Sequence, residues 1–265
     1  MATLIINQNK NPEINQDEFD LNEYGQIHEM ADWQGVLDIY LQLKKDVYPK
    51  KVFVVLDDVG QAMYTSMHAT QNDDLYFDLE EQFKDVSEND FKQIEAQQGV
   101  HEVNYYVKQL LKDKNIIEIK DLKNCLKYDT DDFKVICQMN HAPLAVLESE
   151  LRIKLVDVET EVLKFAVLPN GYFSCDLQPF ESFAIIQLLE KFGFEFLGLG
   201  ASLLGFVKTE SFKIEKSTAL IDELNQVYHF DLSTQNTLIQ HIKTQNYLIL
   251  TYTESPQEYA DFYDV

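Results

Sequence analysis

Arginine is nearly absent from this chain: Arg152 is the single arginine among 22 basic residues, which face 45 acidic ones. The formal net charge at pH 7 is therefore -23 over 265 residues. Proteins that bind nucleic acids or anionic lipids neutralise phosphate groups with lysine and arginine, so this composition argues against direct binding of either. Because the protein itself is the anion, its charged partner is expected to be a basic protein surface.

Cysteine and long apolar runs are also scarce. Cys125, Cys137 and Cys175 are odd in number and widely spaced, which argues against a disulfide framework and favours a reducing compartment. Residues 1–10 have neither the basic nor the apolar region of a signal peptide, and no stretch reaches the roughly 18 apolar residues of a spanning helix. The sequence therefore predicts a cytoplasmic protein without a membrane partner.

The chain nevertheless has enough apolar residues to fold. They make up 45% of the sequence, and 12% of all residues are aromatic, whereas disordered acidic segments contain few aromatics. The length and the apolar content of each half favour two domains. The break at His141-Ala142-Pro143 places their boundary near 140–155, giving domains over 1–145 and 155–265.

The C-terminal half has the clearest periodicity. Apolar spacing predicts a helix at 179–192, ended by Gly193, and further helices from 215 and around 238–242. Strands are predicted at 161–168, 171–177, 194–198, 203–208 and 247–252, the first two joined by an Asn-Gly turn. This order resembles the split βαβ, ferredoxin-like arrangement, an antiparallel sheet with helices on one face.

The N-terminal half has a related pattern. Helices are predicted at 33–45 and within 75–113, and strands at 3–6, 52–56, 62–68, 116–119 and 134–139. The predicted fold class is therefore α+β with antiparallel sheets, one arrangement being two tandem ferredoxin-like domains.

Part of the C-terminal half resembles an uncharacterised bacterial family, the domain of unknown function numbered 4253. The similar segments are 186–193, Phe196-Leu197-Gly198-Leu199-Gly200, the helix end Tyr228-His229-Phe230-Asp231 and the closing apolar strand. The chain departs from that family in having Asp231-Leu232 in place of a Cys-Pro, and no tryptophan in its last strand. The resemblance implies a small α+β domain and no established activity.

Acidic residues are concentrated in three segments. Residues 1–30 carry a net charge of -5, residues 71–90 a net charge of -7 and residues 251–265 a net charge of -4. Aromatic side chains alternate with the acids in the last two segments, and such a mixture suits an interface with a basic partner. The predicted partner-binding residues are Asp73, Asp74, Tyr76, Phe77, Asp78, Glu80, Glu81, Asp85, Glu258, Tyr259, Asp261 and Tyr263.

Patterns that suggest cofactor or metal binding each lack an essential part. The glycines at 198, 200 and 205 have the wrong spacing for a dinucleotide loop and precede a predicted strand. Residues 129–140 lack the glycine and glutamate of a calcium loop. Cys137 and His141, with Cys125 upstream, lack the paired spacing of a zinc site. We therefore expect no cofactor and no metal.

Catalytic patterns are equally incomplete. Cys175 has no nucleophile context, and a core position explains it better. Asp57-Asp58 follows an apolar strand, where catalytic carboxylates occur, although a turn-forming role before Val59-Gly60 is favoured. Catalytic residues are therefore not predicted.

The sequence favours a non-catalytic acidic protein that neutralises a basic protein, such as a bacterial immunity protein for a toxic effector or a nuclease inhibitor. The alternative is an enzyme or small-ligand-binding protein with a cleft between its two halves, where Asp57, Asp58 and His141 would converge. An exposed acidic surface is expected in the first case and a deep pocket in the second.

Overall fold

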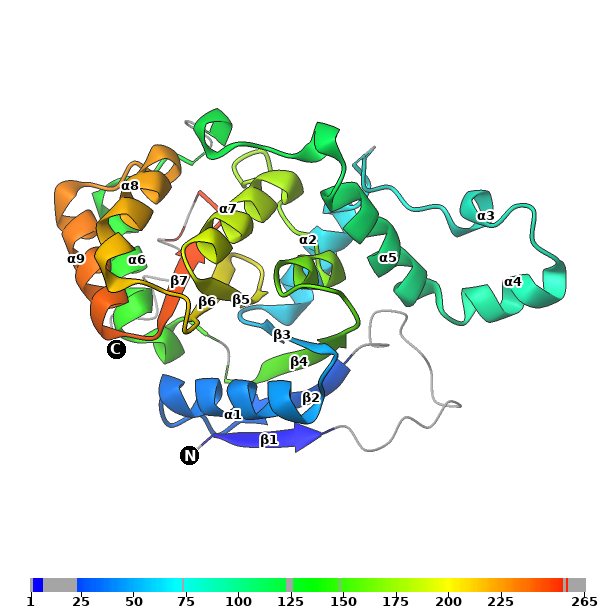
Figure 1. The fold of residues 1–265 in the computed structure, drawn as a ribbon, viewed down its shortest axis with the longest axis horizontal. Coiled ribbons are helices and arrows are strands. Elements are labelled where there is room, and N and C mark those ends of the chain that lie inside the picture. Colours follow the sequence, from blue (N-terminus) through cyan, green and yellow to red (C-terminus); the bar gives the residue numbers. More distant parts are fainter. Residues whose placement is uncertain are drawn as a thin grey trace.

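The computed structural model describes residues 2–6, 23–72, 74–122, 126–147, 149–254 and 256 (Figure 1). Its strands are β1 (Thr3–Ile6), β2 (Glu23–His28), β3 (Lys51–Val55), β4 (Leu151–Val156), β5 (Phe194–Leu199), β6 (Leu203–Lys208) and β7 (Tyr247–Thr251). Its α-helices are α1 (Trp33–Asp46), α2 (Val59–Ala69), α3 (Leu79–Gln82), α4 (Glu88–Glu95), α5 (Gln98–Leu110), α6 (Thr130–His141), α7 (Pro179–Lys191), α8 (Ser217–Tyr228) and α9 (Leu232–Thr244). The 3₁₀ helices are η2 (Asp113–Asn115), η3 (Ile119–Leu122), η4 (Pro143–Ala145), η5 (Val162–Val167) and η6 (Ile214–Lys216). Among the described residues, no helix is both long enough and apolar enough to cross a membrane.

The strands form one seven-stranded sheet in the order β1-β2-β4-β3-β5-β6-β7. Every neighbouring pair is antiparallel except β3 and β5, which run parallel at the centre. The fold is therefore α+β with a mostly antiparallel sheet, which confirms the predicted class. The tandem ferredoxin-like arrangement is not confirmed, because strands from both halves of the chain join in the same sheet.

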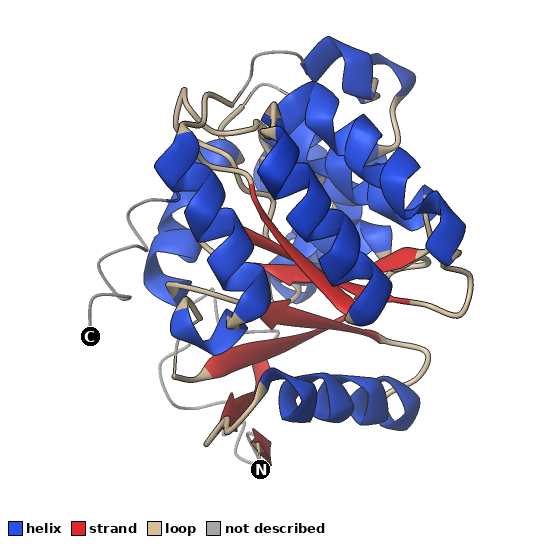
Figure 2. Cartoon of the chain, turned by 90° about the vertical axis from the view of Figure 1, so that its left-hand side faces the viewer, coloured by secondary structure: helices blue, strands red, loops and turns tan. Residues whose placement is uncertain are grey.

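Helices cover both faces of the sheet rather than one (Figure 2). On one face, Phe196 of β5 contacts Phe53 of β3 and Phe165 of η5, and α7 packs over them. Side chains alternate along a strand, so the neighbouring Glu195 points to the other face. There it meets Tyr40 of α1. The apolar side of α1 is thus buried against the sheet opposite to α7.

The outer edge of β7 is covered by α6. Asn140 of α6 donates a hydrogen bond to the carbonyl oxygen of Ile249 at 2.7 Å and accepts one from its N–H at 2.8 Å. An exposed strand edge presents unpaired backbone groups that can recruit another chain. One buried side-chain amide therefore satisfies the centre of this edge, and α6, α8 and α9 pack together beside it.

Several predicted strands are helical in the structure. Residues 62–68 belong to α2, because Asp58 caps that helix by accepting from the N–H of Gln61 at 2.9 Å. Residues 134–139 belong to α6, whose first turn is fixed by a capping box between Asp129 and Asp132. The predicted strands at 116–119, 161–168 and 171–177 are irregular or 3₁₀ helical. In α2 and α6, capping by an aspartate favours the helix, although both segments contain β-branched residues that favour a strand.

Candidate functional site

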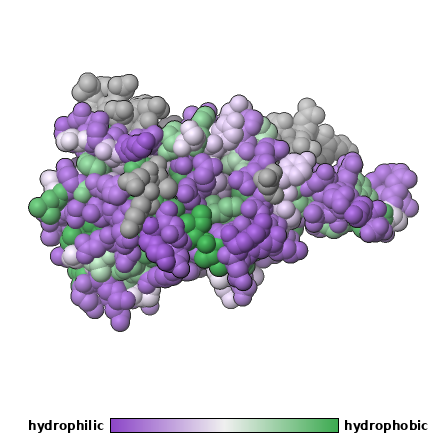
Figure 3. Space-filling view, turned by 90° about the horizontal axis from the view of Figure 1, so that it is seen from above, coloured by the Kyte–Doolittle hydropathy of each residue, from purple (hydrophilic) through white to green (hydrophobic). Residues whose placement is uncertain are grey.

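The most distinctive surface feature is a projecting segment, residues 76–97, which contains α3 and α4 and which we call the acidic arm. It extends from the body of the molecule beyond the start of α5 (Figure 1). None of its residues is buried, and it contains seven acidic side chains against two lysines. Its surface is mostly hydrophilic where it extends to the right in Figure 3. The arm is therefore an acidic, solvent-exposed protrusion.

The arm owes its local structure to capping and ring contacts. Asp78 caps α3 by accepting from the N–H of Glu81 at 2.9 Å, and Ser87 caps α4. The Phe77 ring contacts that of Tyr105 of α5 in a tilted arrangement with ring centroids 5.3 Å apart, and Phe83 meets His101 edge to face at 4.9 Å. These contacts order the segment at the edges of α5 without burying a core of its own.

The structure places the predicted partner-binding residues of this region together on or beside the arm. Glu80 and Asp85 are exposed, and half of the Tyr76 surface is exposed, at 50%. Glu81 forms an ion pair with Lys84 at 2.9 Å, and Asp74, just before the arm, pairs with Lys114. Asp73, Glu258, Tyr259, Asp261 and Tyr263 lie outside the described residues.

A cavity of about 190 Å³, which we call the root cavity, lies where the arm joins the body. Its walls come from α2, the arm, α5, β4 and residues 166–169. Its polar lining consists of Ser66, Thr70, Gln71, Glu102, Tyr106 and Lys154. Burial raises the pKa of Tyr106, so its phenol keeps its proton at neutral pH.

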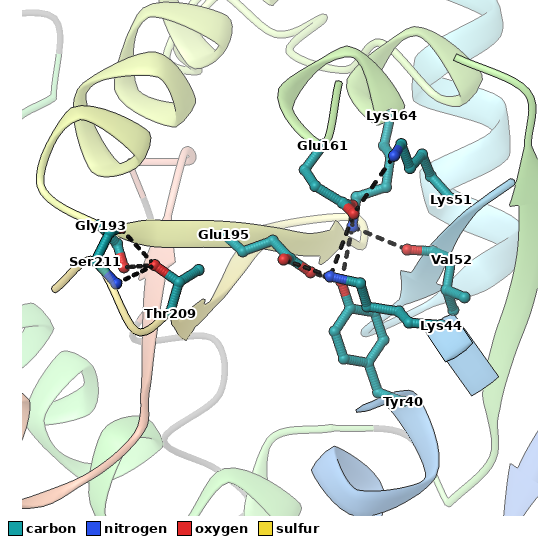
Figure 4. A network of polar contacts seen from close by, with 10 residues as sticks. All are labelled: Tyr40, Lys44, Lys51, Val52, Glu161, Lys164, Gly193, Glu195, Thr209 and Ser211. Carbon is teal, nitrogen blue, oxygen red and sulfur yellow. Dashed lines mark hydrogen bonds and ion pairs between the residues drawn. The ribbon is translucent and has the colours of Figure 1, made fainter. Parts of the chain in front are cut away.

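A partly buried group of opposite charges surrounds the fully buried Lys164 where β3 and β5 diverge (Figure 4). The two parallel strands pair only toward their carboxyl ends, so the earlier carbonyl of Val52 has no strand partner on this side. Lys164 of η5, which has no exposed surface, places its Nζ 2.9 Å from that oxygen and 2.9 Å from Tyr40 Oη. Glu161 Oε2 lies 3.0 Å from the same nitrogen. Lys164 thus fills the gap between the strands.

The charges extend outward from Lys164 as an alternating network. The Tyr40 hydroxyl donates to Glu195, whose other oxygen lies 2.5 Å from the Nζ of Lys44. Lys44 also contacts Glu161 at 3.2 Å, and Lys51 approaches that carboxylate at 4.0 Å. Each glutamate therefore faces at least one ammonium group, so the charges are compensated within the network.

The pKa directions fit a structural role for this network. Burial lowers the pKa of Lys164, and Glu161 and Glu195 oppose that effect. Burial would raise the pKa of Glu161, but Lys164 and Lys44 outweigh it and lower that pKa overall. Lys164 does not line the root cavity. We therefore assign the network to the cohesion of the sheet.

The residues of the predicted cleft lie at separate structural positions. Asp57 is buried and accepts hydrogen bonds from the N–H groups of Ser202 and Leu203, at 3.1 and 3.3 Å, which holds the turn between β5 and β6. Asp58 caps α2, and His141 ends α6. None of these three side chains lines the root cavity. Asp57 therefore holds the turn between β5 and β6, and Val59-Gly60 begins α2 in place of the predicted turn between two strands.

Within the described part of the chain, no group of three or more metal-binding side chains comes together. Burial raises the pKa of the thiols of Cys137 and Cys175, which disfavours the thiolate that metal binding or nucleophilic attack requires. Cys125 lies outside the described residues.

Comparisons with known proteins give no relative for this chain. No protein-family model matches it, and no curated protein and no solved structure was found to be similar. The resemblance of the C-terminal part to an uncharacterised family therefore stays a prediction.

The sequence interpretation missed the root cavity. Its charged residues come from separate elements, with Lys154 in β4 and Glu102 in α5, and no local motif joins them. One signal was present: Arg152 and Lys154 both interrupt the apolar residues of Leu151–Val156, and a lysine buried in such a strand needs a polar partner.

Proposed function

We propose that the protein is a non-catalytic binding protein that neutralises a basic protein, such as a toxic effector or a nuclease, by inserting the acidic arm into a basic cleft. The arm carries this proposal, because it places seven carboxylates on a protrusion of which no residue is buried. Exposed carboxylates steer a basic partner during approach and pair with its lysines and arginines on contact.

The arm also offers apolar contacts. Tyr76 is 50% exposed and Val86 is 37% exposed, within the same segment as Glu80, Glu81 and Asp85. Aromatic and apolar anchors give an interface much of its energy, while surrounding charges set orientation and association rate. In a nuclease cleft, the carboxylates of the arm would occupy the phosphate positions and its apolar anchors would occupy the base positions.

The test compares two variants with the same loss of charge. The arm variant is Glu80→Gln, Glu81→Gln and Asp85→Asn, and the control is Glu210→Gln, Glu215→Gln and Asp222→Asn, three exposed acids of the C-terminal part. Each protein is immobilised and used to capture proteins from a lysate of the native host, and the captured proteins are then purified and titrated.

We expect the wild type and the control to bind the same basic protein. The arm variant should bind it about 3- to 150-fold more weakly, since each of the three exposed ion pairs contributes about 0.2–1 kcal/mol. Binding should weaken with added salt, and the captured protein should lose its activity in the complex. Equal affinity of the two variants, or capture of no basic protein at any salt concentration, would refute the proposal.

A further inference from the structure

The root cavity presents one buried cation and one anion from different walls. Lys154 projects from β4 and is only 7% exposed, while Glu102 lies on α5 at the root of the arm. Glu102 accepts from Gln98 Nε2 at 2.8 Å, and both charged side chains have polar contacts within the protein. Glu23 stands opposite Lys154 in β2 but does not line the cavity. A ligand inside would therefore meet charges of both signs.

The remaining lining is suited to a small apolar group. Met63, Met67, Phe77 and Val103 contribute apolar surface, and the hydroxyl groups of the cavity lie among them. A cavity of about 150 Å³ can hold benzene, so the 190 Å³ found here accommodates a slightly larger molecule. The cavity thus combines the volume of a small metabolite with two charged anchors.

We propose that the root cavity binds a small zwitterion with an apolar side chain, of the class of free α-amino acids. Its carboxylate would face Lys154, its ammonium group would face Glu102, and the thioethers of Met63 and Met67 would contact its side chain. A net charge of -23 disfavours a simple anion, whereas a zwitterion adds no net charge. A simple amine would use only Glu102, whereas a zwitterion uses both charged side chains of the lining. This inference stands independently of the partner proposed for the arm.

The first test uses the wild-type protein and three leucine-related probes. L-leucine carries both charges, 4-methylpentanoate lacks the ammonium group, and 3-methylbutylamine lacks the carboxylate. Binding is measured by calorimetry and by protein NMR, with L-methionine as a second zwitterion. We expect the zwitterions to bind about 10- to 100-fold more tightly than either singly charged analogue, because a hydrogen bond to a charged group contributes about 1.5–3 kcal/mol.

The second test assigns each charge to its residue. Lys154→Met should remove the advantage of L-leucine over 3-methylbutylamine, and Glu102→Gln should remove its advantage over 4-methylpentanoate. Lys120→Met and Glu118→Gln are the controls, since these residues form an exposed ion pair in a separate groove and should leave all affinities unchanged. Absence of binding by both zwitterions, or equal binding of a singly charged analogue to the wild type, would overturn the proposal even if a variant fails to fold.

Discussion

Replacing Lys164 tests whether the charge network holds the centre of the sheet. The side chain has no exposed surface, and its nitrogen lies within 3.0 Å of three oxygens, those of Tyr40, Val52 and Glu161. Lys164→Met keeps an unbranched chain of similar size, so the variant removes the ammonium group while leaving little additional space. Its effect should therefore come from the three oxygens that lose their partner.

The expected loss of stability follows from those oxygens. The Val52 carbonyl has no strand partner on this side, and the Glu161 carboxylate loses its nearest cation, although Lys44 remains 3.2 Å away. Removing one member of a buried ion pair typically costs about 3–5 kcal/mol. We therefore expect Lys164→Met to lower the free energy of unfolding by about 3–5 kcal/mol at neutral pH.

Urea denaturation, followed by circular dichroism and by tyrosine and tryptophan fluorescence, measures this difference. A second variant, Lys164→Met with Glu161→Gln, removes the unpaired charge as well and should recover part of the lost stability. Lys84→Met is the control, since Lys84 is exposed and its ion pair with Glu81 lies on the surface of the arm. A loss below about 1 kcal/mol, or a double variant less stable than the single one, would refute the assignment.

Three further predictions concern the sheet and its edge. A Cβ at Gly198 would lie 1.9 Å from a carbonyl oxygen of β3, so Gly198→Ala should lower the free energy of unfolding, measured by urea denaturation, by at least about 3 kcal/mol. Gly60→Ala is the control and should be tolerated, because its Cβ would lie 3.7 Å from a side-chain oxygen. Asn140→Leu removes both hydrogen bonds to Ile249 and should lower the unfolding free energy by about 2–4 kcal/mol. Burial lowers the pKa of His241 to about 4, so the stabilising contribution of its neutral ring is complete above pH 6.5 and is lost as the pH falls toward 4. His241→Gln lacks this titrating group, so its free energy of unfolding should fall by about 2 kcal/mol less than that of the wild type over the same pH range. Parallel measurements of stability against pH test this difference.

The elements predicted well from sequence are those whose apolar periodicity agrees with their caps. The helices at 33–46 and 179–191 have an apolar face, and Gly193 takes a positive φ of 91° after the second. The strands at 51–55, 194–199, 203–208 and 247–251 are short apolar runs between turn signals. In these segments local propensity and tertiary packing favour the same conformation.

The secondary structure was predicted wrongly where an aspartate that caps a helix was interpreted as part of a turn or loop. The strand predicted at 134–139 is wrong, because Asp129 and Asp132 form a capping box that starts α6 just before it. Asp58 was assigned to a turn between two strands, and it caps α2 instead. β2 and β4 were missed, since each depends on pairing with strands distant in the sequence. Those pairings carry no local pattern.

The candidate site was predictable in composition and not in shape. The acidic and aromatic content of residues 71–90 pointed to an interface, but its extension as a protrusion through α4 depends on how α5 packs against the body. The root cavity depends on that same packing, because Glu102 reaches it from α5 and Lys154 from β4. Sites assembled from separate elements require the tertiary structure before they can be recognised.

The arm differs from the rest of the chain in how little burial stabilises its folded conformation. Ordering a segment costs conformational entropy, and like charges on it repel, yet no residue of the arm is buried to offset either effect. Elsewhere the fold compensates charge internally, as Lys44, Lys51 and Lys164 do with Glu161 and Glu195. That network uses more lysines than glutamates, so it leaves the remaining surface more acidic. The stability of the sheet therefore does not account for the arm, and the basic partner proposed above would supply the compensation that the fold itself lacks.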